Sequence, residues 1–410
     1  MATRGTEKRD RDRDRGRERI LVVCTRYIGD TVLAIPFLRN LRRAFPDAVI
    51  DICAEGPARG VLADCPYVDD LVSWTRPGRR GPVAALAAIR TQAAWLAGRR
   101  YTKAYLLKRS LSAGLLVTLA GIPVRVGLAG DGRWLLTRAV TAARGRHQAA
   151  RYLDLLRAEG IDVDDGHSEN WVAPATAARV SQLVARLPAG RPRVFLAPQS
   201  TAPEKHWPAD RWEAVIEWLV LARGCEVIFC GGPKDVVEHN QLRAAVGRDV
   251  ADHVHDFTAE LSLRETGGLV ARMDACLGVD TGLVHLAASH GVPVAVLVGP
   301  TDPNQWSPWT ARAVVVRSAH VRRPLADRLP TGIAPATTAW PFGEAAMDDI
   351  AVEDVVVAIS AMLPDPEPPP AAAAARTDMR SLDLRPGSFR YEVLAIDAAA
   401  SPSGALPVAG

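Results

Sequence analysis

The sequence ILVVCTRYIGDTVLAIPFLRNLRRAFPDAVI occupies residues 20–50 and decides the fold class. It begins with a short β-rich apolar run and continues through the turn TRYIGD. Apolar residues then recur with helical spacing at Ala34, Leu38 and Leu41. The order is strand, turn, helix, and the next strand follows as AVIDICAE at 48–55. Strands that alternate with helices in this way predict a parallel sheet in an α/β fold.

The alternation of strand and helix runs through most of the chain and restarts once. Further β-type runs stand at 103–107 and 124–128, and after the joint LPAGRPR the pattern begins afresh near Arg193 and ends with a helix at 352–363. A chain of 410 residues exceeds the usual size of one domain, so we predict two. The predicted parts are a disordered charged tail at 1–18, a first Rossmann-like domain at 19–188, a second at 189–363, and a disordered Pro/Ala-rich extension at 364–410.

Composition and charge exclude several classes of function. The net charge is +4, but residues 1–19 hold eight Lys or Arg and five Asp or Glu, so only +1 belongs to the rest of the chain. That sum implies no basic field over the folded body, and nucleic acid is not an expected partner. No apolar window reaches the length of a membrane span, and the charged start does not resemble a secretory signal. We therefore expect a cytoplasmic protein without a transmembrane segment.

The cysteine and histidine patterns give no sign of a metal centre. The six cysteines lie scattered, mostly within apolar runs and without a CxxC pair, which indicates buried free thiols. They are Cys24, Cys53, Cys65, Cys225, Cys230 and Cys276. The nine histidines lack paired ligand spacing. We therefore expect neither a metal ion nor another cofactor.

Three segments together resemble glycosyltransferase family 9, whose best-known members are the ADP-heptose:lipopolysaccharide heptosyltransferases. They lie at 20–50, 195–219 and 256–309, in the order and spacing of the family, and the likeness covers about residues 19–363. The resemblance implies the GT-B architecture, in which two Rossmann-like domains face each other with the active site in the cleft between them. The acceptor would lie mainly on the first domain and the nucleotide mainly on the second. The segment at 311–345 lacks the Cys-containing pattern of many relatives, which leaves the acceptor open.

Asp30 stands in the turn after the first strand, next to Gly29. Open α/β sheets bind ligands at the carboxyl ends of their strands, so both residues belong to the expected cleft. From the residues alone, two interpretations stay open. Asp30 caps the following helix, since Asp is a preferred N-cap residue, or it faces the cleft while Thr31 caps the helix. The resemblance implies the second, with Asp30 as the catalytic base that takes the proton of the acceptor hydroxyl.

The loop PQSTAPEKHWP follows a strand of the second domain and carries Ser200, Thr201 and Lys205. Hydroxyl donors and one cation in a strand-to-helix loop suit the oxygens of a diphosphate, whereas a solvated surface lysine is the plain alternative. Lysine provides only five of the 50 basic residues, so a surface position in this chain would more often carry arginine. We predict that these three residues bind the donor. Trp207 beside them is expected to pack against the next helix.

The sequence GVDTGLVHLAAS places Asp280, Thr281 and Gly282 at the start of a helix, with His285 about one turn later. Free backbone N–H groups and the helix dipole favour an anion at such a position. A capped helix with a core histidine is the alternative. With the resemblance, Thr281 and Gly282 are predicted to hold phosphate oxygens, while Asp280 and His285 shape the donor pocket.

Thr301 and Asp302, after another strand end in GPTDPNQW, extend the predicted cleft. The implied reaction is a single inverting displacement, in which the acceptor hydroxyl attacks the anomeric carbon and the nucleotide diphosphate leaves. The resemblance implies ADP-heptose as the donor. The acceptor is a lipopolysaccharide core glycolipid or a small-molecule glycoside, and a peripheral contact with a membrane stays open. The rival classes are a nucleotide-sugar epimerase of the same architecture and a non-catalytic nucleotide-sugar-binding protein without the base.

Overall fold

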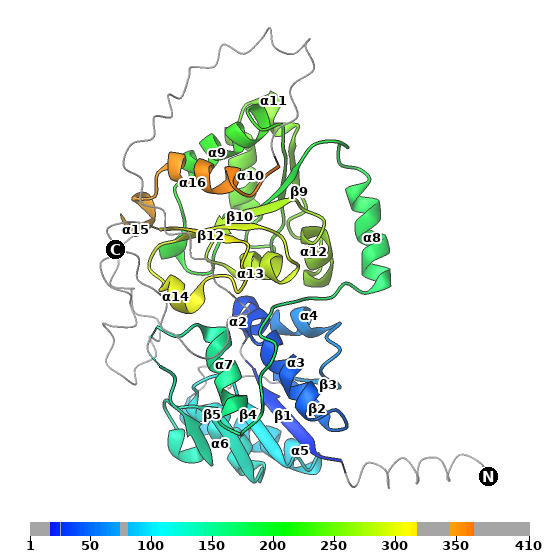
Figure 1. The fold of residues 1–410 in the computed structure, drawn as a ribbon, viewed down its shortest axis with the longest axis vertical. Helices are drawn as coiled ribbons and strands as arrows, with labels where there is room; N and C mark the ends of the chain where they lie inside the picture. The colour runs from blue at the N-terminus through cyan, green and yellow to red at the C-terminus, as the bar shows by residue number, and fades with distance from the viewer. Residues whose placement is uncertain (1–16, 25, 74–80, 144, 318–344, 365–410) are drawn as a thin grey trace, which may run out of the picture.

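The computed structural model describes residues 17–24, 26–73, 81–143, 145–317 and 345–364. Within them the chain forms two six-stranded parallel sheets, one from each half of the sequence, with the first below the second in Figure 1. Helices accompany both sheets, which confirms the predicted α/β class. The predicted tail and extension lie outside the described residues, apart from 17, 18 and 364.

The first sheet has the strand order β3-β2-β1-β4-β5-β6. Its strands are β1 (Arg19–Val23), β2 (Val49–Ala54), β3 (Asp70–Ser73), β4 (Lys103–Leu106), β5 (Val124–Leu128) and β6 (Arg138–Val140). Its helices are α2 (Ile28–Leu33), α3 (Ile35–Ala44), α4 (Ala58–Leu62), α5 (Pro82–Gly98), α6 (Leu111–Leu119) and α7 (Gln148–Arg157), with the 3-10 turn η1 (Arg133–Leu135). The predicted strands are confirmed. The edge strands β3 and β6 were not predicted. With four and three residues, they are too short to show a pattern of alternating apolar and polar side chains.

The second sheet has the order β12-β11-β10-β7-β8-β9. Its strands are β7 (Arg193–Ala197), β8 (Glu226–Phe229), β9 (Val254–Asp256), β10 (Ala275–Val279), β11 (Val294–Val298) and β12 (Ala313–Arg317). Its helices are α8 (Pro174–Val184), α9 (Ala209–Leu221), α10 (Val236–Ala245), α11 (Arg248–Ala251), α12 (Leu263–Val270), α13 (Gly282–Ser289), α14 (Pro303–Trp306), α15 (Ala345–Asp348) and α16 (Val352–Ser360), with the 3-10 turn η2 (Pro203–Lys205).

The two sheets share one winding scheme. In each, the chain starts at a central strand, adds two neighbours on one side, and then crosses to build the other side. This is the doubly wound Rossmann order, in which ligands bind beyond the carboxyl ends of the strands where the winding reverses. The reversal lies between β1 and β4 in the first sheet and between β7 and β10 in the second. The topology therefore predicts that ligands bind at the loops that follow these four strands.

Both sheets are buried on their two faces, which explains why the central strands are continuous apolar runs. Strand β10 is buried along its whole length, and so is β11. Trp207 packs edge-on against Trp212 of α9, with ring centroids 5.0 Å apart, which confirms its predicted packing role. Its Nε1 donates a hydrogen bond to the Ile350 carbonyl oxygen at 3.0 Å.

The packing of α8 differs from the predicted division of the chain at 188/189. Val180 and Val184 of this helix belong to the apolar core under the second sheet, and α8 lies against α12. The division assigned α8 to the first domain because the joint LPAGRPR is the clearest break in the sequence. The structure instead joins α8 to the second domain, so the crossing between domains precedes Pro174.

The domains meet where α2 of the first lies directly under α13 of the second (Figure 1). A Cβ atom at Gly29 would lie 2.9 Å from Cδ2 of His285, and one at Gly282 would lie 2.6 Å from Cβ of Ile28. Both positions therefore need glycine for this close approach. An apolar cluster of Val32, Ile35, Val61 and Leu286 surrounds the contact. The two helix starts are thus held at a fixed separation.

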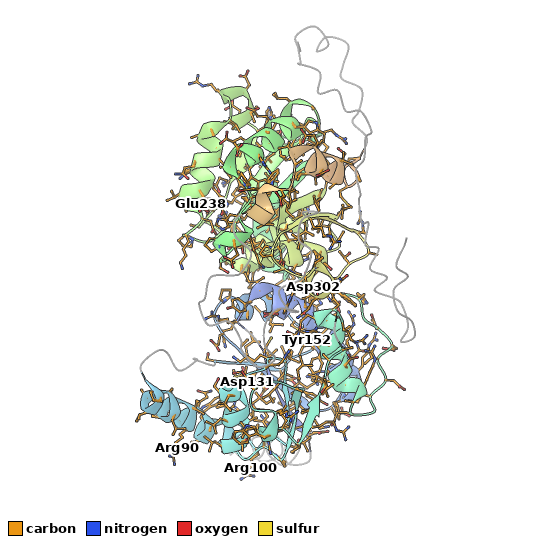
Figure 2. All side chains as sticks on the ribbon, turned by 90° about the vertical axis from the view of Figure 1, so that its left-hand side faces the viewer. Arg90, Arg100, Asp131, Tyr152, Glu238 and Asp302 are labelled. Atoms are coloured by element: carbon orange, nitrogen blue, oxygen red, sulfur yellow. The ribbon has the colours of Figure 1, made fainter. Side chains whose placement is uncertain are left out.

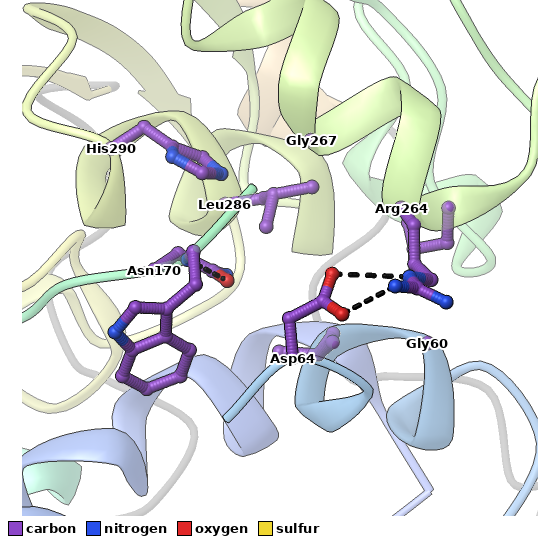
Figure 3. A pocket seen from close by; sticks show the side chains of 10 residues that line it. Gly60, Asp64, Asn170, Arg264, Gly267, Leu286 and His290 are labelled. Atoms are coloured by element: carbon purple, nitrogen blue, oxygen red, sulfur yellow. Dashed lines mark hydrogen bonds and ion pairs between the residues drawn. The ribbon is translucent and has the colours of Figure 1, made fainter. Parts of the chain in front are cut away.

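A second contact joins the domains beside a small pocket (Figure 3). The Arg264 guanidinium of α12 donates two hydrogen bonds to the Asp64 carboxylate, which follows α4. Asn170 and Trp171, on the segment that crosses between the domains, line the same pocket. Because the paired groups are partly exposed, this bridge sets the orientation of the domains more than it stabilises the fold.

The loop around α14 returns from the second domain to the first. Nδ1 of His147 accepts a hydrogen bond from the Ala149 amide at 3.2 Å, so Nε2 carries the proton and donates to the Ser307 carbonyl oxygen at 2.9 Å. Burial lowers the pKa of His147 to about 3, which keeps the ring neutral. The indole of Trp309 donates to the Gly166 carbonyl oxygen at 2.5 Å. These bonds close the junction on the side of α7.

We expect Gly282→Ala to disturb the junction, because its Cβ would overlap Ile28. Overpacking of this kind typically lowers the free energy of unfolding by about 1–3 kcal/mol. Gly98→Ala, at a helical position with open space around the missing Cβ, is the matched control and should change it by less than about 1 kcal/mol. Chemical denaturation of the two variants measures the difference, and equal stabilities would show that the helices tolerate wider spacing.

Candidate active site

Residues that follow the reversal-point strands of both sheets gather at the junction. Lys205 comes from the loop after β7, Asp280 directly follows β10, and Asp30 lies in the helix after β1. The second sheet adds Thr301 from the loop after β11. Because the strands of each sheet are parallel, the loops of each sheet lie at its carboxyl edge. The candidate active site therefore forms where the ligand-binding edges of the two sheets face each other.

Asp280 is the centre of the second-domain half of this site. Its carboxylate Oδ2 accepts hydrogen bonds from Lys205 Nζ and from Thr301 Oγ1, each at 2.7 Å. Its other oxygen, Oδ1, lies 3.6 Å from Nε2 of His285. Asp280 is only 8% exposed. Its buried carboxylate therefore keeps the side chains of Lys205, Thr301 and His285 in a fixed arrangement.

The charge state of Asp280 follows from these contacts. Burial alone would raise its pKa, but the Lys205 ammonium and the bond to His285 outweigh burial and hold the pKa well below its usual range. Asp280 is therefore ionised at neutral pH. The Lys205 side chain keeps some access to solvent, so the ammonium has further hydrogen-bonding directions for a ligand.

The start of α13 lies beside this ion pair. Thr281 is the N-cap residue and makes no side-chain capping bond, while Gly282 is the first helical residue. The amide groups of this first turn point out of the helix start, where an anion is favoured. His285 is buried one turn later against Gly29 of the first domain. The predicted positions of all four residues from Asp280 to His285 are thus confirmed, whereas their roles stay predictions.

Asp30 does not cap its helix, which corrects one of the two interpretations. Helix α2 starts at Ile28 with Tyr27 as N-cap, so Asp30 is the third helical residue. Thr31 does not cap it either, because its buried hydroxyl donates to the Tyr27 carbonyl oxygen at 2.8 Å. Asp30 is half-buried in the first turn, one residue from the contact of Gly29 with His285. Burial raises the pKa of the Tyr152 phenol in α7, and the negative charge of Asp30 raises it further.

The remaining predicted residues lie in the neighbouring loops. Ser200 is half-buried and its hydroxyl accepts from the Ala202 amide at 3.3 Å, while Thr201 is exposed. Within the described residues neither hydroxyl is hydrogen-bonded to Asp280. Asp302 caps α14 by accepting a bond from the Asn304 amide at 3.0 Å. The structure therefore brings Lys205 and Thr301 to Asp280 and leaves Ser200, Thr201 and Asp302 at the rim.

Sequence reasoning missed Arg151, which lies in α7 on the first-domain side. Its side chain is buried, at 6% exposure, and its Nε has no hydrogen-bond partner among the described residues. Burial and the nearby Arg109 lower the pKa of Arg151, and Asp302 opposes them only in part. Figure 2 shows Tyr152, the next residue, just below Asp302 at the junction. An arginine within the buried stripe of an amphipathic helix is the signal that identifies it.

Comparison with known proteins decides the family. A sequence model described as glycosyltransferase family 9 (heptosyltransferase) matches residues 90–328, more than half of the chain. The chain belongs to glycosyltransferase family 9. Lipopolysaccharide heptosyltransferase 2 of Escherichia coli K12 is 26% identical over 309 residues, which cover 73% of this chain and 88% of that protein.

Solved structures of the family share the fold. The Escherichia coli ADP-heptose lipopolysaccharide heptosyltransferase II matches with a TM-score of 0.68 at 23% identity, over 84% of this chain and 98% of that one. A family 9 glycosyl transferase from Veillonella parvula matches with a TM-score of 0.71 at 21% identity, over 84% and 97%. These matches confirm the predicted GT-B architecture, and the family makes the protein a glycosyltransferase.

Two further expectations concern the cysteines and membrane-spanning helices, and both can be compared with the described residues. All six cysteines are buried and none forms a disulfide, as predicted. Burial raises the pKa of Cys53 and Cys65 to about 12, so neither thiol suits nucleophilic chemistry. Among the described residues, no helix combines the length and apolar character needed to cross a membrane.

The depressed pKa of Asp280 predicts a pH-dependent stability difference between the wild type and Asp280→Asn. Because the folded pKa lies below the unfolded value of about 3.9, the stabilisation by Asp280 is complete above about pH 5 and is lost as the pH falls towards the folded pKa. We expect Asp280→Asn to be less stable by about 2 kcal/mol at pH 7 and the difference to shrink below about pH 4. Asp162→Asn, an exposed control, should differ by less than about 0.5 kcal/mol throughout. A difference for Asp280→Asn that grows in acid would contradict the ion pair.

Proposed function

We propose that this glycosyltransferase moves heptose from ADP-heptose to a hydroxyl of an anionic acceptor, with inversion and without a divalent metal. The observation that carries the proposal is the contact of α2 with α13. In this contact Gly29, the neighbour of Asp30, lies against His285, and His285 Nε2 lies 3.6 Å from Asp280 Oδ1. A transfer site needs a base on one side of the sugar and positive charge on the other. We infer that the junction provides both, the base from the first domain and the positive charge from the second.

Asp30 is the proposed general base. Its carboxylate accepts the proton of the acceptor hydroxyl as the oxygen forms its bond to the anomeric carbon. Asp30 is half-buried in the first turn of α2, where the positive end of the helix dipole favours a carboxylate. Its place in the first domain fits an acceptor that binds mainly there.

The second-domain group is the proposed cradle of the leaving ADP. As the bond between the anomeric carbon and the diphosphate oxygen breaks, its electron pair remains on that oxygen. Lys205 Nζ, fixed by Asp280, and the free amides at the start of α13 are placed to stabilise the added negative charge. Lys205 thereby provides the positive charge that a metal ion provides in other phosphate sites.

The donor assignment rests on the relatives, since one is named for lipopolysaccharide heptosyl transfer and a solved structure is named for ADP-heptose. The acceptor class rests on Arg151. A buried guanidinium with an unpaired Nε is unfavourable unless a ligand pairs it, and its natural partner is a carboxylate or phosphate. An acceptor with a carboxylate or phosphate would give Arg151 such a partner, whereas a neutral natural-product glycoside would not.

Incubation of the full chain with ADP-heptose, with and without an anionic glycolipid acceptor, tests the reaction. We expect ADP release to require the acceptor, the product to be inverted, and EDTA to leave the rate unchanged. Conversion of the donor without acceptor would indicate an epimerase. Loss of activity in EDTA that magnesium or manganese restores would overturn the metal-independent step.

Asp30→Asn tests the base. Loss of a general base slows the chemical step by about 10²- to 10⁴-fold, whereas loss of a favourable first-turn charge costs about 1 kcal/mol or less of stability. We expect the variant to keep its melting temperature within a few degrees and its affinity for ADP, and to lose transfer by at least about 10²-fold. Turnover near the wild-type rate would remove Asp30 from the mechanism.

Arg151→Gln tests the acceptor subsite. Loss of a charged hydrogen bond should raise the acceptor KM by about 10- to 100-fold with little change in the donor KM. Because burial disfavours the Arg151 charge, its removal should leave the protein about as stable as the wild type. Arg157→Gln, on the same helix and paired with Asp154, is the control and should change neither KM. An unchanged acceptor KM in Arg151→Gln would refute the anionic subsite.

A further inference from the structure

The loop between β11 and β12 is part of the second domain in sequence, but its C-terminal half packs on the first domain. We call residues 299–310, which include α14, the α14 loop. Trp306 and Trp309 of this loop pack against the apolar core of the first domain. Figure 1 shows α14 at the junction, above α7 of the first domain. The α14 loop therefore joins the two domains in addition to the contact of α2 with α13.

Three contacts fix the C-terminal half of the α14 loop on the first domain. His147, the N-cap residue of α7, donates from Nε2 to the Ser307 carbonyl oxygen at 2.9 Å. The indole N–H of Trp309 donates to the Gly166 carbonyl oxygen at 2.5 Å. The rings of His147 and Trp309 also lie against each other, with centroids 4.4 Å apart. Because Ser307 is only 2% exposed, water does not compete for the bond that His147 makes to it.

The N-terminal half of the α14 loop carries Thr301, whose hydroxyl donates to Asp280 Oδ2 at 2.7 Å. The same oxygen accepts a hydrogen bond from Lys205 Nζ at 2.7 Å. Because both donors share one oxygen of a buried carboxylate, the position of the Thr301 hydroxyl influences how that carboxylate holds Lys205. A displacement of the loop at Thr301 would therefore change the direction of the Lys205 ammonium.

The residues between the two halves form one hydrogen-bonded unit. The Asp302 carboxylate accepts a bond from the Asn304 amide at 3.0 Å, and the Asp302 carbonyl oxygen accepts one from the Trp306 amide at 3.0 Å. The Ser307 amide then donates to the Pro303 carbonyl oxygen at 3.0 Å. These bonds leave the segment little conformational freedom, so the two halves of the loop move together.

We propose that Trp309 is a positioning residue of the donor site. With the bond from His147, it anchors the α14 loop on the first domain and so holds the Thr301 hydroxyl on Asp280. The donor group of the second domain keeps its arrangement only while the loop contacts the first domain. The inference rests on the proposed function, because that function assigns Lys205 to the donor diphosphate.

A double-variant cycle on the full chain tests the inference, with the affinity for ADP measured by isothermal titration calorimetry. Thr301→Val removes one hydrogen bond from Asp280 and should weaken ADP binding by about 3- to 10-fold. Trp309→Phe keeps an aromatic ring but loses the bond to Gly166, and it should weaken ADP binding by about 2- to 5-fold. Because both changes act through Asp280, the variant with both should bind ADP as strongly as Thr301→Val alone.

Two further variants complete the design. Trp218→Phe is the matched control, because Trp218 is also partly buried but packs on the core of the second domain. It should bind ADP like the wild type. If Trp309→Phe does not fold, His147→Asn takes its place in the cycle with the same expected result. Asparagine still caps α7, but its shorter side chain does not reach Ser307.

Three results would overturn the inference. The anchoring variant could bind ADP as strongly as the wild type, or the loss in the double variant could equal the product of the two single losses. The control Trp218→Phe could also lose as much affinity as Trp309→Phe, which would make the effect a general one of losing an indole. Failure of the proposed function is distinguishable, because the wild type itself would then bind no ADP, and the inference would fall with the donor site.

Discussion

The close contact of α2 with α13 is the constraint on which the proposed active site depends. Two glycines, Gly29 and Gly282, let the helix starts approach to a distance that any Cβ would prevent. The contact joins the domains at the point where the winding of both sheets reverses. It therefore sets the separation between a carboxylate on one domain and a cationic group on the other. The orientation of the domains and the geometry of the proposed site both depend on this helix pair.

Two of the charged groups at this contact are stabilised within their own domain. Asp280 is neutralised by Lys205 and supported by Thr301, all within the second domain. On the first domain, Asp30 lies at a helix start that favours its charge. Arg151 is the exception, because its side chain is buried and its Nε has no hydrogen-bond partner in the part of the chain that the structure describes. Natural proteins keep such unfavourable groups mainly where a ligand completes them, which is why Arg151 carries the argument for an anionic acceptor.

The sequence determines the sheets and the donor half of the site more clearly than the rest. Strands such as β10 and β11 are buried on both sides, so their apolar runs are unambiguous, and the Asp-Thr-Gly start of α13 follows directly from its local pattern. The start of α2 was misplaced because Ile28 is fixed by Gly282 of the other domain, a contact that local pattern does not contain. The assignment of α8 and the burial of Arg151 likewise depend on packing between distant segments. Local propensity reflects only residues that are close in sequence, so it does not predict such contacts.

The central claim is that both domains contribute to one site, with the diphosphate on the second and the base on the first. A crystal structure of the full chain with a non-transferable ADP-heptose analogue tests it most directly. We predict a diphosphate oxygen within hydrogen-bonding distance of Lys205 Nζ and of an amide at the start of α13. We also predict the Asp30 carboxylate on the face of the sugar opposite the leaving oxygen. A diphosphate bound away from Lys205 and α13, or a sugar remote from Asp30, would contradict it.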